Sequence, residues 1–259
     1  MKVRVKFRKE GAMKFIGHLD VMRYFQKAIR RAEIDIQYSK GYNPRQEMSF
    51  ASPLGVGLTS DSEYVDLILG ECGSSKEMID RLNAVMVEGF TVCKFNQVKD
   101  ETKNAMSIVA AADYLVSLKD GYSICDREGF DFKQEFDAFM NMEEIVILKK
   151  SKKSERMVNI KPWIYSYSFD MDKIYENSIC DRYENGNAVM MKLSGGSVNN
   201  LKPELVMEAF CNHLQVEFNP FAWQLHRLEV YENLKPVGED EPVDLTTFVP
   251  LDSETTEMM

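Results

Sequence analysis

FIGHLDVMRYFQKAIRRAEIDIQYSKGYNPRQEMSFASPLGVGL, residues 15–58, contains the helix and strand around which the first half of the chain is predicted to fold. Apolar residues recur at three- and four-residue steps in its first part, which predicts an amphipathic helix over residues 18–32. Gly41 and Pro44 indicate a turn after this helix, and a strand is expected at residues 48–54. The predicted buried stripe of the helix is Leu19, Met22, Phe25, Ile29 and Ala32.

The remaining patterns of the first half complete one compact motif. Apolar and polar residues alternate in residues 3–7, and this strand is expected to continue or pair through residues 13–16. Further elements are expected as strands at residues 63–69 and 90–96 and a helix at residues 75–86. The resulting order, β-α-β-β-α-β, is that of the ferredoxin-like or split βαβ arrangement.

The second half repeats this order with one additional strand. Strands are expected at residues 107–118, 144–150, 157–167, 188–193 and 223–231, and helices at residues 132–142 and 203–214. We therefore predict an α+β chain of two tandem ferredoxin-like units with antiparallel sheets. The predicted boundaries are residues 1–97 for the first unit, residues 105–232 for the second and residues 233–259 for an acidic tail.

Charge is distributed unevenly along the chain. Residues 1–46 contain twelve basic and four acidic residues, a net charge of +8, although the whole chain of 259 residues carries −9. Residues 237–259 contain seven acidic residues and no basic one, which predicts a disordered acidic tail that either solubilises the protein or folds back on the basic N-terminal face. The basic region indicates a surface for a polyanion or an acidic partner.

Other features limit the compartment and the chemistry. The five cysteines are scattered without a CxxC pair, so free thiols in a reducing environment are expected. The longest apolar runs fall far short of the ~20 residues that span a bilayer, and the N-terminus lacks the apolar core of a secretory signal. These observations predict a cytoplasmic protein with no membrane segment and no resident metal or cofactor.

The candidate binding site lies in the helix and the turn of residues 15–58. Arginine and lysine occupy the outer helix face, and the following turn combines aromatic residues for base stacking with cations for phosphates. The site is predicted to bind RNA or another phosphate-rich ligand, with a solvated basic surface as the alternative. Its predicted residues are His18, Arg23, Lys27, Arg30, Arg31, Tyr38, Lys40, Tyr42, Asn43 and Arg45.

A second basic patch is expected at a turn between two strands. It consists of Lys150, Lys152, Lys153 and Arg156, and either a solvated hairpin tip or a second phosphate contact fits this composition. The sequence contains no HExxH, GxSxG or phosphate-loop motif, and it offers no convincing Cys–His pair. No catalytic residue is therefore predicted, and the chain is not expected to act as an enzyme on its own.

Three segments together resemble the radical SAM-linked protein family, a domain of unknown function. They are residues 17–21 (GHLDV), 38–44 (YSKGYNP) and 49–57 (SFASPLGVG), and residues 63–66 (EYVD) fit as well. Members of that family are fused to, or encoded beside, radical SAM proteins that often bind cobalamin. The resemblance implies a radical SAM protein as partner, and it brings no catalytic residues.

The chain departs from the family pattern at two places. Gly17 stands where the family usually has Ser, which removes a side-chain helix cap, and Arg45-Gln46 replace a common His-Pro. The chain also lacks the CxxxCxxC motif that would hold an iron–sulfur cluster, so the resemblance implies a companion of the radical enzyme.

Three functions remain as alternatives. The first is a non-catalytic accessory subunit that presents RNA or a ribonucleoprotein to a radical SAM enzyme. The second is an RNA-processing or RNA-modifying enzyme of tandem ferredoxin-like fold, for which His18 is the only available base. The third is a protein-interaction module whose basic face docks an acidic partner or the acidic tail.

Overall fold

The computed structural model describes residues 1–259 except 100, 151–154, 197–198 and 236–242. The chain forms two compact units: unit 1 comprises Met1–Ala111 together with Arg227–Met259, and unit 2 comprises Ala112–His226. Unit 1 is built from two separate stretches of chain. The predicted boundaries, which follow chain order, stay a prediction.

Unit 1 contains an antiparallel sheet with two helices. β1 pairs with both β3 and β4, and the short β2 pairs with β3, which gives the local order β4-β1-β3-β2. This confirms an α+β fold with antiparallel strands and the element order expected for the first half. The elements are β1 (Lys2–Lys9), α1 (His18–Arg31), β2 (Met48–Phe50), β3 (Thr59–Ile68), α2 (Ser75–Asn83) and β4 (Phe90–Val98).

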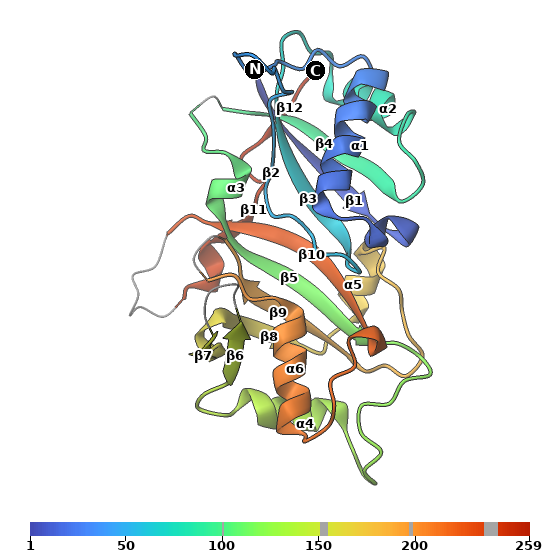
Figure 1. Ribbon diagram of the computed structural model, residues 1–259, viewed down its shortest axis with the longest axis vertical. Helices are drawn as coiled ribbons and strands as arrows, with labels where there is room; N and C mark the ends of the chain where they lie inside the picture. The colour runs from blue at the N-terminus through green and yellow to red at the C-terminus, as the bar shows by residue number, and fades with distance from the viewer. Residues whose placement is uncertain (100, 151–154, 197–198, 236–242) are drawn as a thin grey trace. The chain divides into compact units, whose positions relative to one another are not determined.

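The two faces of the unit 1 sheet differ in chemistry, because side chains of β1 alternate between them. Val3, Val5 and Phe7 join one hydrophobic core with Phe25 of α1 and Leu82 of α2. Both helices lie on this side of the sheet (Figure 1). Lys2, Arg4 and Lys6 fall on the opposite face.

The charges on the opposite face are paired. Arg4 donates to both carboxylate oxygens of Asp66, at 2.8 and 3.1 Å, and both side chains are only 2% exposed. Lys6 donates to Glu229 at 2.6 Å, and the Tyr64 hydroxyl donates to the same carboxylate at 2.7 Å. Burial and this neighbouring carboxylate raise the pKa of Tyr64 well above its ordinary value.

The C-terminal segment is folded, so the prediction of a disordered tail is wrong for residues 243–259. β11 (Phe248–Pro250) pairs with β10 (Trp223–Asn233), and β12 (Thr256–Glu257) pairs with β4. Leu251 is 1% exposed, and its carbonyl oxygen accepts a hydrogen bond from Arg4 at 2.5 Å. The segment combines the apolar anchor Leu251 with the Asp252 carboxylate, which lies 2.7 Å from Lys94 and 4.0 Å from Lys6, and these contacts hold it against the sheet.

In unit 1 the structure differs from the predicted elements near the ends of these elements. Residues 13–16 do not extend the first strand, because Gly11–Phe15 form a 3₁₀ helix, η1. Leu19 is 61% exposed, since it lies in the first turn of α1 on the solvent side. The buried residues of α1 are Val21, Phe25, Ala28 and Ile29.

Unit 2 contains the neighbouring strands β5, β9 and β8, in the order β5-β9-β8, and a separate two-stranded ribbon, β6–β7. Rings of both α4 and α6 share its core; the centroids of Phe136 and Phe210 are 5.1 Å apart. The elements are β5 (Val109–Leu118), α4 (Phe132–Met140), β6 (Val146–Lys150), β7 (Glu155–Asn159), β8 (Ile164–Ser168), β9 (Ala188–Ser194) and α6 (Pro203–His213).

Unit 2 also departs from the expected elements. The strand expected at residues 157–167 is two strands, because Lys161–Trp163 form a 3₁₀ turn around Pro162, which lacks a backbone N–H. The short helix α5 (Asp172–Asn177) of unit 2 was not expected, nor was the short helix α3 (Ala105–Ile108), which lies in unit 1.

The cysteine thiols and the length of the helices are two further properties of the described residues. All five cysteines are free, and burial raises the pKa of the Cys211 thiol to about 11, so this thiol stays protonated at neutral pH. Among the described residues, no helix combines the length and apolar character that crossing a bilayer requires.

We predict that Leu251→Ala destabilises the protein by about 2–5 kcal/mol, because it removes a buried side chain that the surrounding structure cannot replace. Leu245→Ala is the matched control, since Leu245 is 40% exposed in the same C-terminal segment. Urea denaturation measures both. Equal, small losses for the two variants would contradict a folded C-terminal segment.

Candidate functional site

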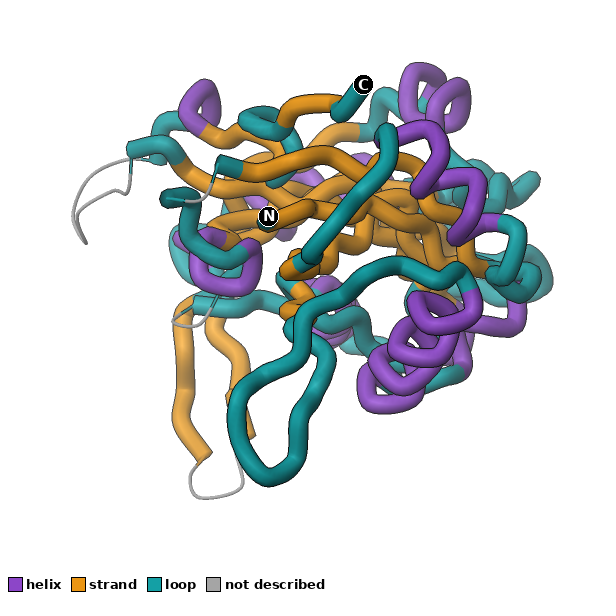
Figure 2. The backbone as a smooth tube through the Cα atoms, turned by 90° about the horizontal axis from the view of Figure 1, so that it is seen from above, coloured by secondary structure: helices purple, strands orange, loops and turns teal. Residues whose placement is uncertain are grey.

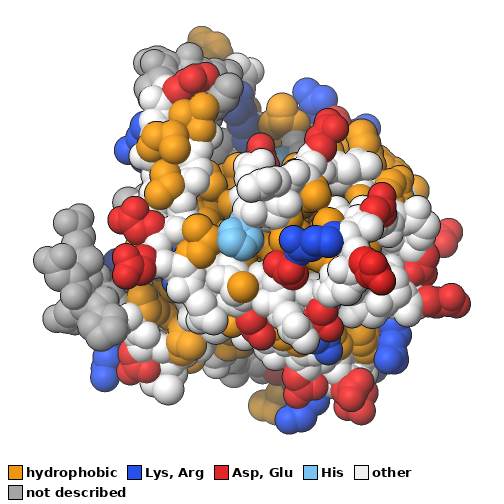
Figure 3. Space-filling model, turned by 90° about the horizontal axis from the view of Figure 1, so that it is seen from below, with side chains coloured by type: hydrophobic (Ala, Val, Ile, Leu, Met, Phe, Trp, Pro, Cys, Tyr) orange, Lys and Arg blue, Asp and Glu red, His pale blue; other side chains and the backbone are white. Residues whose placement is uncertain are grey.

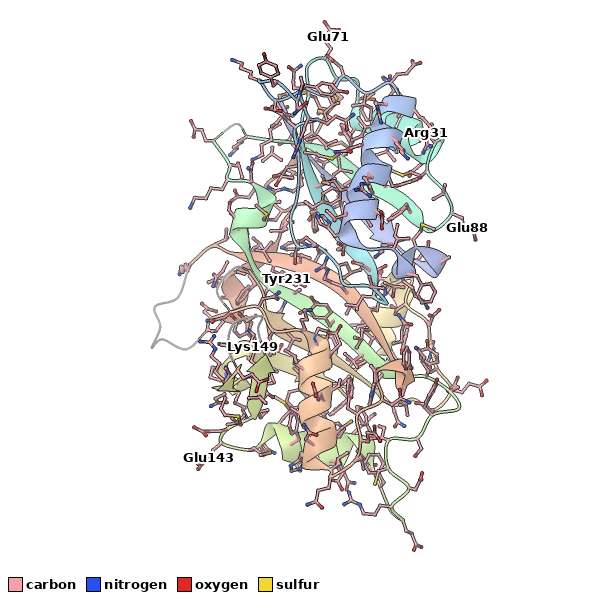
Figure 4. All side chains as sticks on the ribbon, in the orientation of Figure 1. Arg31, Glu71, Glu88, Glu143, Lys149 and Tyr231 are labelled. Atoms are coloured by element: carbon pink, nitrogen blue, oxygen red, sulfur yellow. The ribbon has the colours of Figure 1, made fainter. Side chains whose placement is uncertain are left out.

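The predicted basic stripe lies on the outer face of α1. Arg23, Lys27, Arg30 and Arg31 are exposed, because the opposite side of the helix packs against the sheet. Arg31 is partly engaged: it donates to the Val85 carbonyl oxygen at 3.1 Å. Arg31 is labelled on α1 in Figure 4.

The turn that follows α1 has a defined shape. Residues Tyr38 and Gln46 form an isolated antiparallel bridge, and the Ser39 amide donates to the Arg45 carbonyl oxygen at 2.8 Å. Gly41 has a φ of 126°, a conformation that glycine adopts more readily than other residues. Tyr42 follows this glycine and is fully exposed.

One side chain anchors the turn to the helix. The Gln46 amide donates to the Gln26 carbonyl oxygen of α1 at 3.3 Å, and it also lies 3.5 Å from the Tyr38 hydroxyl. Because this contact reaches the middle of α1, residues from both elements can be treated as one surface. We call it the loop–helix surface; it comprises Arg23, Lys27, Arg30, Tyr38, Lys40, Tyr42, Asn43 and Arg45.

Several cations of the loop–helix surface are available to a ligand. Within the described residues, the side chains of Lys27, Lys40 and Arg45 have no hydrogen-bond or ion-pair partner in the protein. Arg23 lies 3.6 Å from Asp20, and this pair is largely exposed. An exposed ion pair of this kind contributes about 0–1 kcal/mol, so a phosphate can compete for it.

The cations of β1 do not belong to this surface. Lys2, Arg4 and Lys9 are buried, and Lys6 is paired with Glu229. The net charge counted over residues 1–46 is therefore larger than the positive charge that is exposed to a partner. The accessible part comes from α1 and the turn.

His18 is placed apart from the loop–helix surface. It is the first residue of α1, and its ring meets Phe50 edge-on with centroids 5.3 Å apart. It lines a small cavity together with Lys9 and Glu63. Burial lowers the pKa of His18, an effect that Glu63 opposes and Lys9 reinforces.

The neighbours of His18 form a buried charged cluster that the sequence analysis missed. Glu63 Oε1 accepts bonds from Arg227 Nη2 at 2.5 Å and Nε at 3.0 Å. Arg227 also donates to the carbonyl oxygen of Ser52 at 2.6 Å. Lys9 donates to the Ile16 carbonyl oxygen at 3.2 Å, and burial lowers its pKa.

A sequence signal for this cluster existed. The segments 17–21, 49–57 and 63–66, which carried the family resemblance, each contribute a residue to it or to its walls. Lys9 and Arg227 lie outside these segments and are far from each other in the sequence. Only the folded strands bring them to His18.

The second basic patch is only partly described. Its Lys152 and Lys153, and the side chain of Lys150, lie outside the described residues, whereas Arg156 is exposed on β7. β6 and β7 form a two-stranded ribbon (Figure 2). On the face shown in Figure 3, the coloured side chains mix basic, acidic and apolar types.

The chain belongs to a family of uncharacterized proteins conserved in bacteria, DUF2344, whose model matches residues 2–203. No curated protein matches it.

Two solved structures are distantly similar to the chain. A chain in a crystal structure of a Cbf5-Nop10-Gar1 complex is 11% identical with a TM-score of 0.45, covering 88% of this chain and 48% of that one. This protein therefore spans about half the length of that chain. An unknown protein from Galdieria sulphuraria is 10% identical with a TM-score of 0.24, covering 87% of this chain and 96% of that one. Neither similarity bears on function.

The lowered pKa of His18 predicts a pH effect on stability. Between the folded and unfolded pKa values of His18 the unfolded state binds more protons, so this residue destabilises the fold as the pH falls below about 6.5. His18→Asn should lose less stability between pH 7.5 and 5 than the parent protein in urea denaturation. His213→Asn, at an exposed position, is the control, and identical pH profiles for His18→Asn and the parent would contradict the prediction.

Proposed function

We propose that this protein is a non-catalytic partner of a radical SAM enzyme that presents RNA or a ribonucleoprotein substrate on its loop–helix surface. One observation carries the RNA part of the proposal: the Gln46–Gln26 hydrogen bond joins an exposed aromatic turn to a basic helix face. The partner is inferred from the resemblance of residues 17–21, 38–44 and 49–57 to the radical SAM-linked family. We also interpret the two halves as tandem ferredoxin-like units.

The chemistry of the loop–helix surface supports a single-stranded nucleic acid as ligand. Lys27, Lys40 and Arg45 supply cations for phosphates, and the fully exposed Tyr42 supplies a ring on which a base can stack. Stacking is tolerant of sequence, so shape and charge would dominate recognition. The partner enzyme would supply the chemistry on the bound substrate.

The position of His18 supports an accessory role over an RNA-processing enzyme. A general base must reach the proton that it removes. His18 lies at the first residue of α1, whereas the anchor of the turn is at Gln26, which places the two about 12 Å apart along the helix axis. The anchored turn therefore lies about two helical turns from this imidazole.

Affinity purification from cells tests the whole proposal. The tagged protein is recovered with and without ribonuclease, and both bound proteins and bound RNA are identified. We expect a radical SAM protein together with ribonuclease-sensitive RNA. Recovery of an acidic protein that resists ribonuclease would instead favour the interaction module, and recovery of neither expected partner would contradict the proposal.

Charge substitutions should change how RNA binding responds to salt. Lys27→Ala, Lys40→Ala and Arg45→Ala should each lower the slope of log affinity against log salt by about 0.7, the value for one phosphate contact with a single strand. Fluorescence anisotropy with a single-stranded RNA measures this. Lys173→Ala, at an exposed position of α5, is the control and should leave the slope unchanged.

Tyr42→Ala should weaken RNA binding through a different mechanism. Loss of base stacking costs about 1–3 kcal/mol, or roughly a 5- to 150-fold fall in affinity, with the salt slope preserved. The exposed Tyr122→Ala serves as control in the same assay. An unchanged affinity for Tyr42→Ala would remove the turn from the proposed interface.

A further inference from the structure

The charges of the buried cluster beneath the start of α1 are not balanced. Among the described residues of this cluster, the cations Lys9 and Arg227 are each 2% exposed, and Glu63, which interacts electrostatically with Lys9, is 6% exposed. The Glu63 carboxylate accepts two hydrogen bonds from the Arg227 guanidinium group. An unbalanced buried charge is costly unless something else pairs with it.

In this cluster, the Lys9 ammonium group makes fewer hydrogen bonds than it can donate. Its ammonium group has three donors, yet among the described residues it donates only to the Ile16 carbonyl oxygen and forms no ion pair within 4.0 Å. The Lys9 side chain lines the cavity that His18 and Glu63 also line. Lys9 therefore brings a buried ammonium group, with one protein hydrogen bond, to the wall of this space.

The size of the cavity limits what can enter it. Its volume is ≈ 10 Å³, about the space of one water molecule or one oxygen atom. Its inner wall includes Phe7 and Phe50, and its lining also includes the exposed Pro53 and the half-buried His18. A ligand can place one atom inside while the rest of it stays near the surface.

The first turn of α1 adds further donors at this place. Its N-cap is Gly17, which has no capping side chain, and the Asp20 and Val21 amides already donate to the Gly17 carbonyl oxygen. The first-turn amides open to an anion in this 14-residue helix are therefore those of His18 and Leu19. Such groups and the helix dipole favour an anion. His18 and Val21 of this helix line the same cavity.

We propose that this cavity binds a phosphate monoester group, one oxygen of which enters beside Lys9 Nζ while the others face His18 and the first turn of α1. A water molecule would give Lys9 an acceptor and leave the charge unbalanced. A carboxylate has two oxygens, whereas a phosphate monoester has three to serve Lys9, His18 and the helix amides together. The loop–helix surface plays no part in this site, so each proposal can fail without the other.

Titration with inorganic phosphate tests the site directly. The ring signals of His18 are followed by NMR, and thermal denaturation is followed in parallel with sodium chloride at matched ionic strength. We expect a saturable shift of the His18 signals and a rise in melting temperature with phosphate. Lys9→Met, which keeps much of the volume without the charge, should weaken phosphate binding at least about tenfold.

Controls make the outcome decisive. Lys14→Met, on the neighbouring η1, should bind phosphate like the parent protein, and His18→Asn provides a second variant at the cavity if Lys9→Met fails to fold. No saturable response to phosphate in the parent protein, or equal responses to acetate and phosphate, would overturn the assignment. Glycerol phosphate and a 5′-phosphorylated dinucleotide then distinguish a small phosphorylated molecule from a nucleic-acid end, and tighter binding of either one supports the site.

Discussion

The buried pair between Arg4 and Asp66 is the interaction on which the rest of unit 1 depends. The two residues are opposite each other in the β1–β3 register, so the pair forms only when these strands align correctly. Removing one partner of such a pair costs about 3–5 kcal/mol, because the other charge stays buried alone. Two backbone groups complete the hydrogen bonding of the buried pair. The Ala105 amide donates to Asp66, and the Leu251 carbonyl oxygen accepts from Arg4.

This constraint separates structural charge from charge that a partner can use. The cations of β1 are held by carboxylates of β3 and β10, and Asp252 of the C-terminal segment lies 4.0 Å from Lys6 of β1 and 2.7 Å from Lys94 of β4. These pairs hold the C-terminal segment against the basic strand. The cations of α1 and the following turn have few protein partners and face solvent. Net charge counted along a sequence does not make this distinction, because pairing is decided by tertiary contacts.

Local patterns in the sequence predicted the parts of the fold that depend on local physics. The period of apolar residues indicated α1 and its exposed basic face, and Gly41 with Pro44 indicated the turn that presents Tyr42. The buried cluster could not be predicted in this way, because Glu63 and Arg227 are 164 residues apart in the chain and meet only in the folded sheet. Leu19 was misassigned for a related reason: its exposure depends on where the helix begins relative to the core.

Crosslinking tests the central claim, that RNA lies on the loop–helix surface, most directly. The protein is irradiated with ultraviolet light in complex with RNA recovered from its own cells, and the crosslinked peptides are identified by mass spectrometry. The account predicts crosslinks on the peptide that contains Tyr38 and Tyr42, with loss of the Tyr42 crosslink at high salt. Crosslinks confined to the β6–β7 ribbon, or an absence of crosslinks on residues 38–45, would contradict it.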